Sequence, residues 1–478
     1  MSPTQRLSSP NSINSDPAPE DLWQQGQLVE VSITDLNHTG EGVGRWGGRV
    51  IFVPDTVTGD RVLVRLVRVK SNHAIGKLYQ LIEKSPHRIR SSCIVADKCG
   101  GCQWQHIDYG YQLEAKQNLV VQALERIGGF TSPPVAPVLT AEDSLAYRNK
   151  ATYPLKRSAT GQVQAGYYQR GSHQLINLNQ CPVQDARLNP LLAEIKQDIQ
   201  QLGWSIYDEN RHQGRLRHLS LRIGRRTGEM LLTLISRDWK LQNLDIQAQQ
   251  WLSRYPKLVG VCINRNPDRT NVIFGDETRC VAGQPYLREA FAGLEFQLRP
   301  ETFFQVNTEA AEALLNVIVE QLDLSGNEVL VDAYCGIGTF TLPLALRVQQ
   351  AIGLEVQSTS VEQARLNAQL NGIANVTFQS GAVEQLLPTL GIAPDIVILD
   401  PPRKGCVSAV GSKSSRTVIE TLLETLPKRI VYVSCKPATL ARDLKLLCQT
   451  GNYQLTHVQP ADFFPQTSHV ESVAFLVR

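Results

Sequence analysis

A thiol and a carboxylate near the C-terminus are placed where they could meet. Cys435 follows the apolar, strand-like run 430–434 in the segment SCKPATLARD, and Glu471 closes the segment DFFPQTSHVE before the last strand-like run. The carboxyl ends of parallel strands form the edge at which α/β proteins bind ligands. Because a thiolate can bond covalently to a substrate and a carboxylate can accept a proton, the pair predicts a nucleophile and a general base.

Other polar side chains lie in the same segments. Asp400 ends the preceding apolar run in DPPRKG and is expected at the same edge. Lys436 and Arg442 are expected to lower the pKa of the thiol, since a nearby cation favours the thiolate. Composition alone favours an inert buried cysteine at position 435 and a structural role for His469, and both interpretations stay open at this point.

The segment VLVDAYCGIGTF at 329–340 has the order strand, glycine-rich turn, helix start. Gly336 and Gly338 permit a sharp bend and a close approach of the backbone to a ligand. Glu355 ends the next strand-like run, where its carboxylate could accept both ribose hydroxyls of a nucleoside cofactor. The third glycine of G-x-G-x-x-G is missing, which disfavours NAD and favours S-adenosylmethionine. An ordinary strand-to-helix turn is the alternative.

Positive charge is concentrated in two stretches, although the net charge is only +3. Residues 61–90 contain eight Lys or Arg and a single acid, Glu83, and residues 211–226 contain six Arg and no acid. Basic side chains on strand-like segments indicate contacts with nucleic-acid phosphates. A solvated polar face is the alternative for each stretch.

Four of the ten cysteines are spaced like ligands of a metal or cluster. Cys93, Cys99 and Cys102 form Cys-x5-Cys-Gly-Gly-Cys, and Cys181 precedes a proline. Four thiolates bind either zinc or an iron–sulfur cluster. Three close cysteines with a remote fourth favour [4Fe–4S] over zinc, and the spacing differs from the C-x3-C-x2-C of radical S-adenosylmethionine enzymes. A structural or RNA-positioning cluster is therefore expected.

Composition bounds the class of protein. A hydrophobic content of 42% in 478 residues is ordinary for a globular protein with two to four domains. No apolar run is long enough to span a membrane, and no secretory signal opens the chain. We therefore expect a cytoplasmic protein that binds no membrane, in a reducing compartment. Residues 1–21, rich in Ser, Pro and Asn, are expected to be a disordered tail.

The N-terminal domain is expected at residues 22–83. Its strand-like stretches are separated by glycine-rich turns at 40–44 and 47–48. Five short strands in about sixty residues, with basic side chains facing outward, predict a small barrel of the oligonucleotide-binding kind.

Residues 84–300 are expected to form a central mixed α+β domain. A helix is predicted at 109–127 from its apolar periodicity. A hairpin is predicted over 219–235, because alternating strands flank a turn at 226–228. Arg222 and other basic residues are expected on the open face of that sheet.

Residues 301–478 alternate apolar strands with helical windows, which predicts a parallel sheet with helices on both faces. The last two strand-like runs, 453–459 and 470–477, predict an antiparallel hairpin typical of Rossmann-like methyltransferases. The insert GSKSS at 411–415 is expected to be an exposed loop. The expected strands that precede the hairpin are 328–332, 350–354, 376–379, 396–400 and 430–434.

With these motifs the chain resembles the RNA uracil-5-methyltransferases, specifically the iron–sulfur branch that acts on 23S rRNA. Cys-x5-CGGC, FFQVN, DAYCGIGTF, DPPRKG, SCKPATLARD and FPQTSHVE occur in family order, and the likeness runs from about residue 22 to 478. The resemblance implies a multi-domain α/β protein: a TRAM RNA-binding barrel at 22–83, a central iron–sulfur domain at 84–300 and a class I methyltransferase domain at 301–478.

The resemblance also implies roles for eight of the residues named above, and for Gln305 of FFQVN and Tyr334 of DAYCG. By this likeness Cys93, Cys99, Cys102 and Cys181 hold a [4Fe–4S] cluster, Gln305, Tyr334 and Glu355 contact S-adenosylmethionine, Asp400 lines the pocket shared by cofactor and uracil, Cys435 is the nucleophile and Glu471 is the base.

The implied reaction requires a thiol and a carboxylate together. C5 of uracil is a poor nucleophile until a thiolate adds to C6, and a base must remove the C5 proton before the thiol can leave. The uridine must also be flipped out of folded RNA, because stacking hides both carbons. The expected partner is 23S rRNA and not DNA, and the protein is expected to be a monomer.

Two other functions are weighed against this one. A tRNA uracil-5-methyltransferase is possible, although such relatives usually lack both the TRAM unit and the cysteines. A non-catalytic RNA-binding protein of this fold would lack Cys435 or Glu471, and both are present. DNA cytosine methyltransferases use Pro-Cys, which this chain does not have at the thiol.

Thr339 and Gly381 depart from the family pattern, so neither is assigned a cofactor contact. The sequence does not identify the methylated uridine.

Overall fold

The computed structural model describes residues 23–406 and 417–478. The expected tail at 1–21 and the expected loop at 411–415 lie outside these residues. The chain divides into two compact units, one ending at Arg88 and the other running from Ile89 to Arg478.

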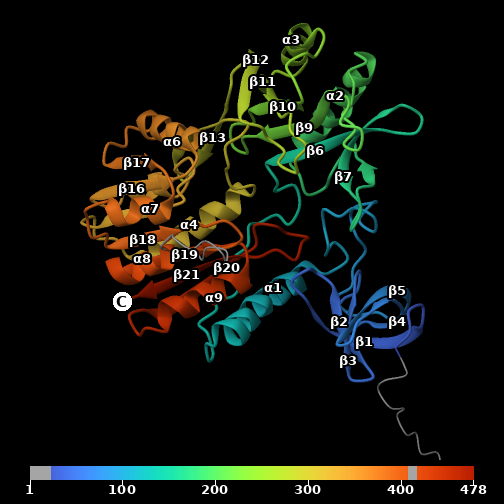
Figure 1. Ribbon diagram of the computed structural model, residues 1–478, viewed down its shortest axis with the longest axis horizontal. Helices are drawn as coiled ribbons and strands as arrows, with labels where there is room; N and C mark the ends of the chain where they lie inside the picture. The colour runs from blue at the N-terminus through green and yellow to red at the C-terminus, as the bar shows by residue number, and fades with distance from the viewer. Residues whose placement is uncertain (1–22, 407–416) are drawn as a thin grey trace, which may run out of the picture. The chain divides into compact units, whose positions relative to one another are not determined.

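The first unit is a closed five-stranded barrel, coloured blue in Figure 1, with the strand order β1-β2-β3-β5-β4. Alternate side chains of each strand point inward, and the interior is filled by β-branched and aliphatic residues such as Val31, Ile51 and Val64. The predicted small barrel is confirmed. Its strands are β1 (Leu28–Leu36), β2 (Gly42–Trp46), β3 (Arg49–Val53), β4 (Arg61–Val69) and β5 (His73–Glu83).

The glycine-rich segment at 40–44 is not simply a turn, as its composition predicted. Gly42 and Gly44 lie in strand β2 and pair with β1. A Cβ atom at Gly44 would overlap the side chain of Val31. Here glycine permits the close approach of two strands in a narrow barrel rather than a reversal of the chain.

The second unit begins with a seven-stranded sheet of order β12-β11-β10-β9-β6-β7-β8. The predicted hairpin is formed by the antiparallel pair β9 and β10, and α2 and α3 pack on this sheet through a shared apolar core. These elements are β6 (Lys150–Arg157), β7 (Val163–Tyr168), β8 (Leu175–Asn177), α2 (Asn189–Gln201), β9 (Leu216–Ile223), β10 (Met230–Ser236), α3 (Leu244–Arg254), β11 (Leu258–Arg265) and β12 (Glu277–Gly283).

The expectation that Arg222 lies on an open face is wrong. Its side chain is buried and donates hydrogen bonds to the carbonyl oxygens of Arg299 at 2.7 Å and Thr302 at 2.6 Å. Arg217 is buried as well and donates to the carbonyl of Asn266 at 2.9 Å. A buried guanidinium group must find its hydrogen-bond acceptors inside the protein. Both groups therefore hydrogen-bond loop carbonyl oxygens and connect the loops to the sheet.

The C-terminal part of the unit is a second seven-stranded sheet of order β17-β16-β15-β18-β19-β21-β20. The first five strands in this order run parallel, and β21 is antiparallel to both neighbours. The predicted parallel sheet with a terminal antiparallel hairpin is confirmed. Its strands are β15 (Val329–Ala333), β16 (Gln350–Glu355), β17 (Val376–Ser380), β18 (Ile396–Leu399), β19 (Arg429–Ser434), β20 (Gln454–Ala461) and β21 (Glu471–Val477).

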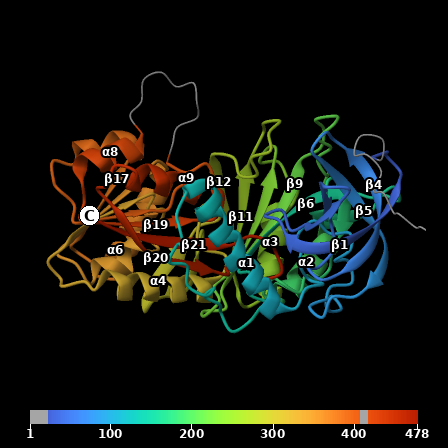
Figure 2. The same cartoon turned by 90° about the horizontal axis from the view of Figure 1, so that it is seen from below.

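Helices cover both faces of this sheet, because successive strand residues point to opposite sides and both sides are apolar. Helices α4 and α6 pack on one face with Leu330 and Ile398, and α1, α8 and α9 pack on the other with Val331 and Leu399 (Figure 2). The helices are α1 (Tyr109–Ala123), α4 (Thr308–Leu322), α5 (Thr341–Ala345), α6 (Ser358–Leu370), α7 (Val383–Leu386), α8 (Val418–Thr425) and α9 (Pro437–Cys448).

Smaller elements complete the second unit. The predicted helix at 109–127 continues past α1 as a π-helical turn, and β13 and β14 form a separate two-stranded hairpin. These elements are the π-helix Leu124–Gly128, the 3-10 helices Ala186–Leu188 and Leu387–Thr389, β13 (Leu287–Phe291) and β14 (Leu294–Leu298).

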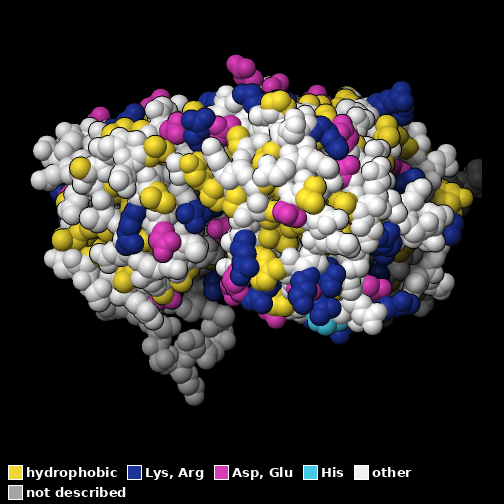
Figure 3. Space-filling view, turned by 90° about the horizontal axis from the view of Figure 1, so that it is seen from above, with side chains coloured by type: hydrophobic (Ala, Val, Ile, Leu, Met, Phe, Trp, Pro, Cys, Tyr) yellow, Lys and Arg dark blue, Asp and Glu magenta, His cyan; other side chains and the backbone are white. Residues whose placement is uncertain are grey.

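Across the ranges 23–406 and 417–478, no helix combines the length and the apolar character needed to cross a membrane. On the face shown in Figure 3, Lys and Arg side chains lie in several separate groups, interspersed with acidic and apolar ones. This distribution agrees with the small net charge of +3.

Replacing Arg222 by methionine is expected to lower the free energy of unfolding by about 3 kcal/mol, because two carbonyl oxygens lose charged donors. Denaturant titration followed by circular dichroism measures the change. Arg211→Met is the matched control, since that side chain is 77% exposed. Equal stability of the two variants would contradict the structural role of Arg222.

Candidate active site

The antiparallel direction of β21 brings the predicted nucleophile and base together. Strand β19 pairs with β21 so that Ser434 lies opposite Ser472. Cys435, the next residue after β19, therefore lies beside Glu471, the first residue of β21. The side chains are 36 positions apart in the sequence, and the reversed strand makes them neighbours at the carboxyl edge of the sheet.

Glu471 is the more buried of the two groups. Only 6% of the residue is exposed, and it pairs in register with Ala461 of β20. Burial raises the pKa of the Glu471 carboxyl well above its ordinary value, and the charge of Asp400 raises it further, whereas Arg403 opposes both effects. The carboxyl group consequently keeps its proton to a higher pH than an exposed glutamate does.

Cys435 is half-buried beside a cation that was not among the predicted residues. Burial raises the pKa of its thiol, the Glu471 charge adds to this increase, and Arg403 lowers the pKa through its charge and a hydrogen bond. Arg403 thus has the effect expected of Lys436 and Arg442. The guanidinium of Arg442 instead binds Asp443 and the carbonyl of Lys404.

Arg403 could have been found from the sequence. It follows Asp400 by three residues in DPPRKG, at the same strand end, so the motif that identified the acid also contained the cation. Arg442 is close to Cys435 in the sequence, but its guanidinium group binds other partners in the folded chain. After Cys435 the chain turns into helix α9, and Arg442 lies within that helix, bound to other groups.

The turn after β15 has the backbone expected of a ligand-binding loop. Tyr334, Gly336 and Gly338 all have positive φ angles, of 78°, 55° and 85°. A positive φ is costly for tyrosine and is found where the surroundings hold the residue in place. The amides of Tyr334 and Cys335 both donate to the carbonyl of Leu354, which ties this turn to strand β16.

Glu355 ends β16 directly beside this turn. One of its carboxylate oxygens accepts a hydrogen bond from the amide of Gly336 at 3.2 Å, and the other accepts from the amide of Gln357 at 2.9 Å. The side chain is therefore oriented along the glycine-rich turn by two backbone donors, at the sheet edge where a ribose would lie.

Asp332 lies on β15, and Asp400 directly follows the adjacent strand β18. Burial raises the pKa of Asp332 to about 7, opposed by a hydrogen bond from the Thr341 hydroxyl at 2.5 Å. Burial and the charge of Asp332 raise the pKa of Asp400 to about 7. Gln305 is buried in the segment before α4, and its backbone carbonyl accepts a hydrogen bond from Asn149 at 2.8 Å.

The four predicted cluster cysteines line one cavity of about 140 Å³, which also includes Thr467. Burial raises the pKa of Cys99 and Cys181, and that of Cys102 to about 12. In the part of the chain that the structure describes, no group of three or more His, Cys, Asp or Glu residues is arranged to hold a metal ion. The structure therefore brings the thiols to one cavity without forming a metal-ion site.

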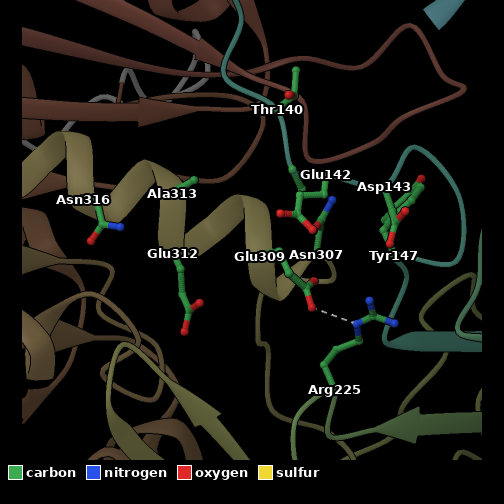
Figure 4. A pocket seen from close by; sticks show the side chains of 11 residues that line it. Thr140, Glu142, Asp143, Tyr147, Arg225, Asn307, Glu309, Glu312, Ala313 and Asn316 are labelled. Carbon is green, nitrogen blue, oxygen red and sulfur yellow. Dashed lines mark hydrogen bonds and ion pairs between the residues drawn. The ribbon is translucent and has the colours of Figure 1, made fainter.

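A wider cavity of about 450 Å³ lies between the segment 140–147 and helix α4, and Tyr147 lines both this cavity and the cysteine cavity (Figure 4). Arg225 points toward Glu309 across it and donates to that carboxylate at 3.1 Å. None of the predicted catalytic, cofactor or cluster residues lines this cavity. Four acidic side chains line it, and two of these, Glu309 and Glu312, are paired with Arg225 and Arg226.

Comparison with known proteins identifies the family. The profile of the tRNA (uracil-5-)-methyltransferases matches residues 108–478, and the TRAM domain profile matches residues 22–79. The chain belongs to the tRNA (uracil-5-)-methyltransferase family. Within it, an RNA methyltransferase of Nostoc described as uncharacterised is 70% identical over 95% of this chain and 97% of its own length. A similarly described protein of Halalkalibacterium halodurans is 39% identical over 95% and 97%.

A solved member of the tRNA (uracil-5-)-methyltransferase family has a similar structure. The Pyrococcus abyssi tRNA (uracil-54, C5)-methyltransferase, in complex with S-adenosyl-L-homocysteine, superposes with a TM-score of 0.72 at 27% identity. The match covers 94% of this chain and 100% of the archaeal one, so it extends into the N-terminal barrel. The presence of a barrel therefore does not separate rRNA-acting from tRNA-acting members, contrary to the sequence-based expectation.

The free enzyme is expected to be alkylated slowly at Cys435 at neutral pH. Alkylation needs the thiolate, and a raised pKa means that the thiolate forms only at a pH higher than for free cysteine. Iodoacetamide labelling read by peptide mass spectrometry across a pH series measures the midpoint. Glu471→Gln should lower the midpoint, and Arg403→Gln should raise it. A midpoint at or below that of free cysteine would contradict this electrostatic picture.

Proposed function

We propose that this protein methylates C5 of a uridine in folded RNA, using S-adenosylmethionine, with Cys435 as nucleophile and Glu471 as base. The single observation that carries the proposal is the register of β19 with β21, which places the thiol beside a buried carboxyl group. S-adenosylmethionine supplies the methyl group when bound. The membership in the tRNA (uracil-5-)-methyltransferase family supports the substrate base.

The two residues divide the reaction between them. The Cys435 thiolate adds to C6 of the uracil, and the ring electrons move to C5 and O4, so that C5 becomes nucleophilic and takes the methyl group. Glu471, once its carboxyl group has released its own proton to solvent, then accepts the remaining proton of C5 as a carboxylate. The electrons of that C–H bond re-form the C5–C6 double bond as the C6–sulfur bond breaks and the thiolate leaves.

The raised pKa of both groups has a role in this scheme. Burial disfavours two adjacent negative charges in the unliganded site, which is why the pKa of the thiol and that of the carboxyl are both raised. Arg403 faces both groups and favours the ionised form of each. We assign to Arg403 the stabilisation of the Cys435 thiolate during attack on C6.

Four residues are assigned to the cofactor and uracil pocket: Gln305, Tyr334, Glu355 and Asp400. The residues present fit a nucleoside cofactor because Glu355 already aligns its carboxylate along the glycine-rich turn. An Asp400 carboxyl with a pKa of about 7 can donate a hydrogen bond when protonated and accept one when ionised. It can therefore bind a uracil edge, which has both donors and acceptors.

Cys93, Cys99, Cys102 and Cys181 are proposed to hold a [4Fe–4S] cluster. Their chemistry fits, since four thiols on one cavity match the four-cysteine ligation of such clusters. A cluster occupies more space than a single ion, which agrees with thiols that share a cavity but form no metal-ion site. We assign the cluster a structural role, without a step in methyl transfer.

Anaerobic reconstitution is expected to give about four iron and four sulfide per chain and a broad visible absorbance band. Cys181→Ala should lower the iron content and weaken the band, because one ligand is lost. Cys448→Ala is the control, since that thiol lies in helix α9, away from the cysteine cavity. Stoichiometric zinc in place of iron would overturn the assignment.

The RNA that we propose as substrate is 23S rRNA, on the resemblance of the cysteine pattern to the rRNA-acting branch. Transfer RNA is the second candidate, because the structural neighbour that matches 94% of this chain acts on tRNA. The barrel supplies a surface suited to either RNA. Arg65 stacks over the exposed ring of Tyr79 at 5.1 Å on neighbouring strands β4 and β5, an arrangement on which an RNA base could stack.

Glu471→Gln is expected to accumulate a covalent complex with RNA, because the adduct on Cys435 forms but the C5 proton is not removed. Denaturing gel electrophoresis with labelled 23S rRNA and, in parallel, labelled tRNA measures both the mechanism and the substrate. Cys435→Ala is the control and should give neither complex nor product. Absence of a complex with either RNA would overturn the mechanism, and a complex with tRNA alone would transfer the proposal to tRNA.

A further inference from the structure

The loop that leads into Glu471 is held from outside the methyltransferase sheet. It spans residues 462–470, between Ala461 at the end of β20 and Glu471 at the start of β21, which pair with each other in register. Its partners come from helix α1 and from the segments before and after that helix, more than 300 residues earlier in the chain.

Gln466 lies near the middle of this loop and has a strained backbone conformation. Its φ angle is 70°, in the left-handed region that a glutamine adopts only when its surroundings hold it there. The side chain of Gln112 in α1 makes a reciprocal pair with it. Gln112 Nε2 donates to Gln466 Oε1 at 3.1 Å, and the amide of Gln466 donates to Gln112 Oε1 at 3.0 Å.

The remaining polar groups of Gln466 are also paired. Its carbonyl accepts a hydrogen bond from the amide of Trp104 at 3.0 Å, and its Nε2 donates to the carbonyl of Ser144 at 3.4 Å. Gln112 in turn donates to the carbonyl oxygens of Trp104 and Ile107, at 3.1 and 2.9 Å. Four hydrogen-bonding groups of one loop residue are thus matched by residues outside the loop.

A buried ion pair holds the start of the same loop. Lys116, one turn after Gln112 in α1, donates to Asp462 Oδ1 at 2.6 Å and to the carbonyl of Phe464 at 3.1 Å. Both charged side chains are fully buried, and the ammonium group lies 5.8 Å from the ring centre of Trp104. Asp462 also accepts a hydrogen bond from the amide of Phe464, so its orientation is defined from two sides.

We propose that Gln112 and Lys116 are positioning residues for the base, holding the loop 462–470 so that the Glu471 carboxyl meets C5 of the bound uridine. The proposal rests on the proposed function, in which Glu471 removes the C5 proton. If these positions served only to fill the protein interior, apolar side chains of similar volume would stabilise the fold equally well. A strained glutamine with every polar group paired defines one loop conformation, as a site that must hold a base within a fraction of an ångström requires.

The cysteine cavity adjoins the same loop. Thr467, next to Gln466, lines the cavity, and Trp104 follows Cys102 by two residues. A change in the conformation of the cysteine segment would therefore reach the loop through the hydrogen bond between Trp104 and Gln466. Cys435 itself follows β19 and does not depend on these contacts, so loss of them should affect proton removal more than adduct formation.

The test compares Gln112→Met and Lys116→Met with Glu114→Met, an exposed position on the same helix. Under single-turnover conditions with RNA and S-adenosylmethionine, the ratio of released methylated RNA to gel-stable adduct is measured. We expect this ratio to fall by about tenfold or more in the first two variants, since small misplacements of a catalytic group have effects of this size. Glu114→Met should match the unmodified protein, and binding of S-adenosylhomocysteine by calorimetry should stay within about twofold in all variants.

The outcomes separate the two proposals. If Glu471→Gln accumulates no adduct, the proposed function fails. A second outcome is that Glu471→Gln accumulates adduct, but Gln112→Met and Lys116→Met leave the ratio of released product to adduct unchanged. In that case only the positioning role is overturned. Unfolding of both variants, detected by near-ultraviolet circular dichroism, would also overturn it, because the contacts would then maintain the fold rather than the base.

Discussion

The direction of one strand determines the chemistry of this site. Parallel strands present only their carboxyl ends at the ligand-binding edge, so a residue at the start of a strand would lie at the far edge. Strand β21 runs antiparallel between β19 and β20, and its first residue, Glu471, therefore reaches the same edge as Cys435. The chain reaches this edge in opposite directions at the two residues, and the proposed addition to C6 and proton removal from C5 would use both groups there.

Burial sets the electrostatics that follow from this geometry. Asp332, Asp400, Glu471 and Cys435 all have raised pKa values, with burial as the largest cause in each case. Arg403 is the cation that acts on both Cys435 and Glu471. Burial therefore disfavours the negatively charged form of each of these groups, and Arg403 opposes this effect at Cys435 and Glu471. The buried Lys116–Asp462 pair and the hydrogen-bonded Gln466 hold the loop 462–470 in place.

Much of the fold could be predicted because periodicity and glycine placement are local signals. The parallel strands, the terminal hairpin, the barrel and the β9–β10 hairpin were all found in this way. The errors concern side-chain surroundings. Arg222 was expected in solvent but is bonded to the backbone of residues 299 and 302, and the glycines at 42 and 44 permit strand contact inside a barrel. Neither setting follows from nearby residues, because both depend on chain segments that meet only in the folded protein.

The sequence by itself determined which residues are chemically capable and which strand ends carry them: Cys435, Asp400, Glu355 and the glycine-rich turn. It also determined the family, through motifs that extend over nearly the whole chain. Only the tertiary structure decided that Arg403 rather than Arg442 acts on the thiol, that the remote Cys181 joins the three close cysteines on one cavity, and that helix α1 holds the loop before Glu471. The physical reason is that charge and hydrogen bonding act through space over a few ångströms, and contacts between residues hundreds of positions apart leave no periodic signal in the chain.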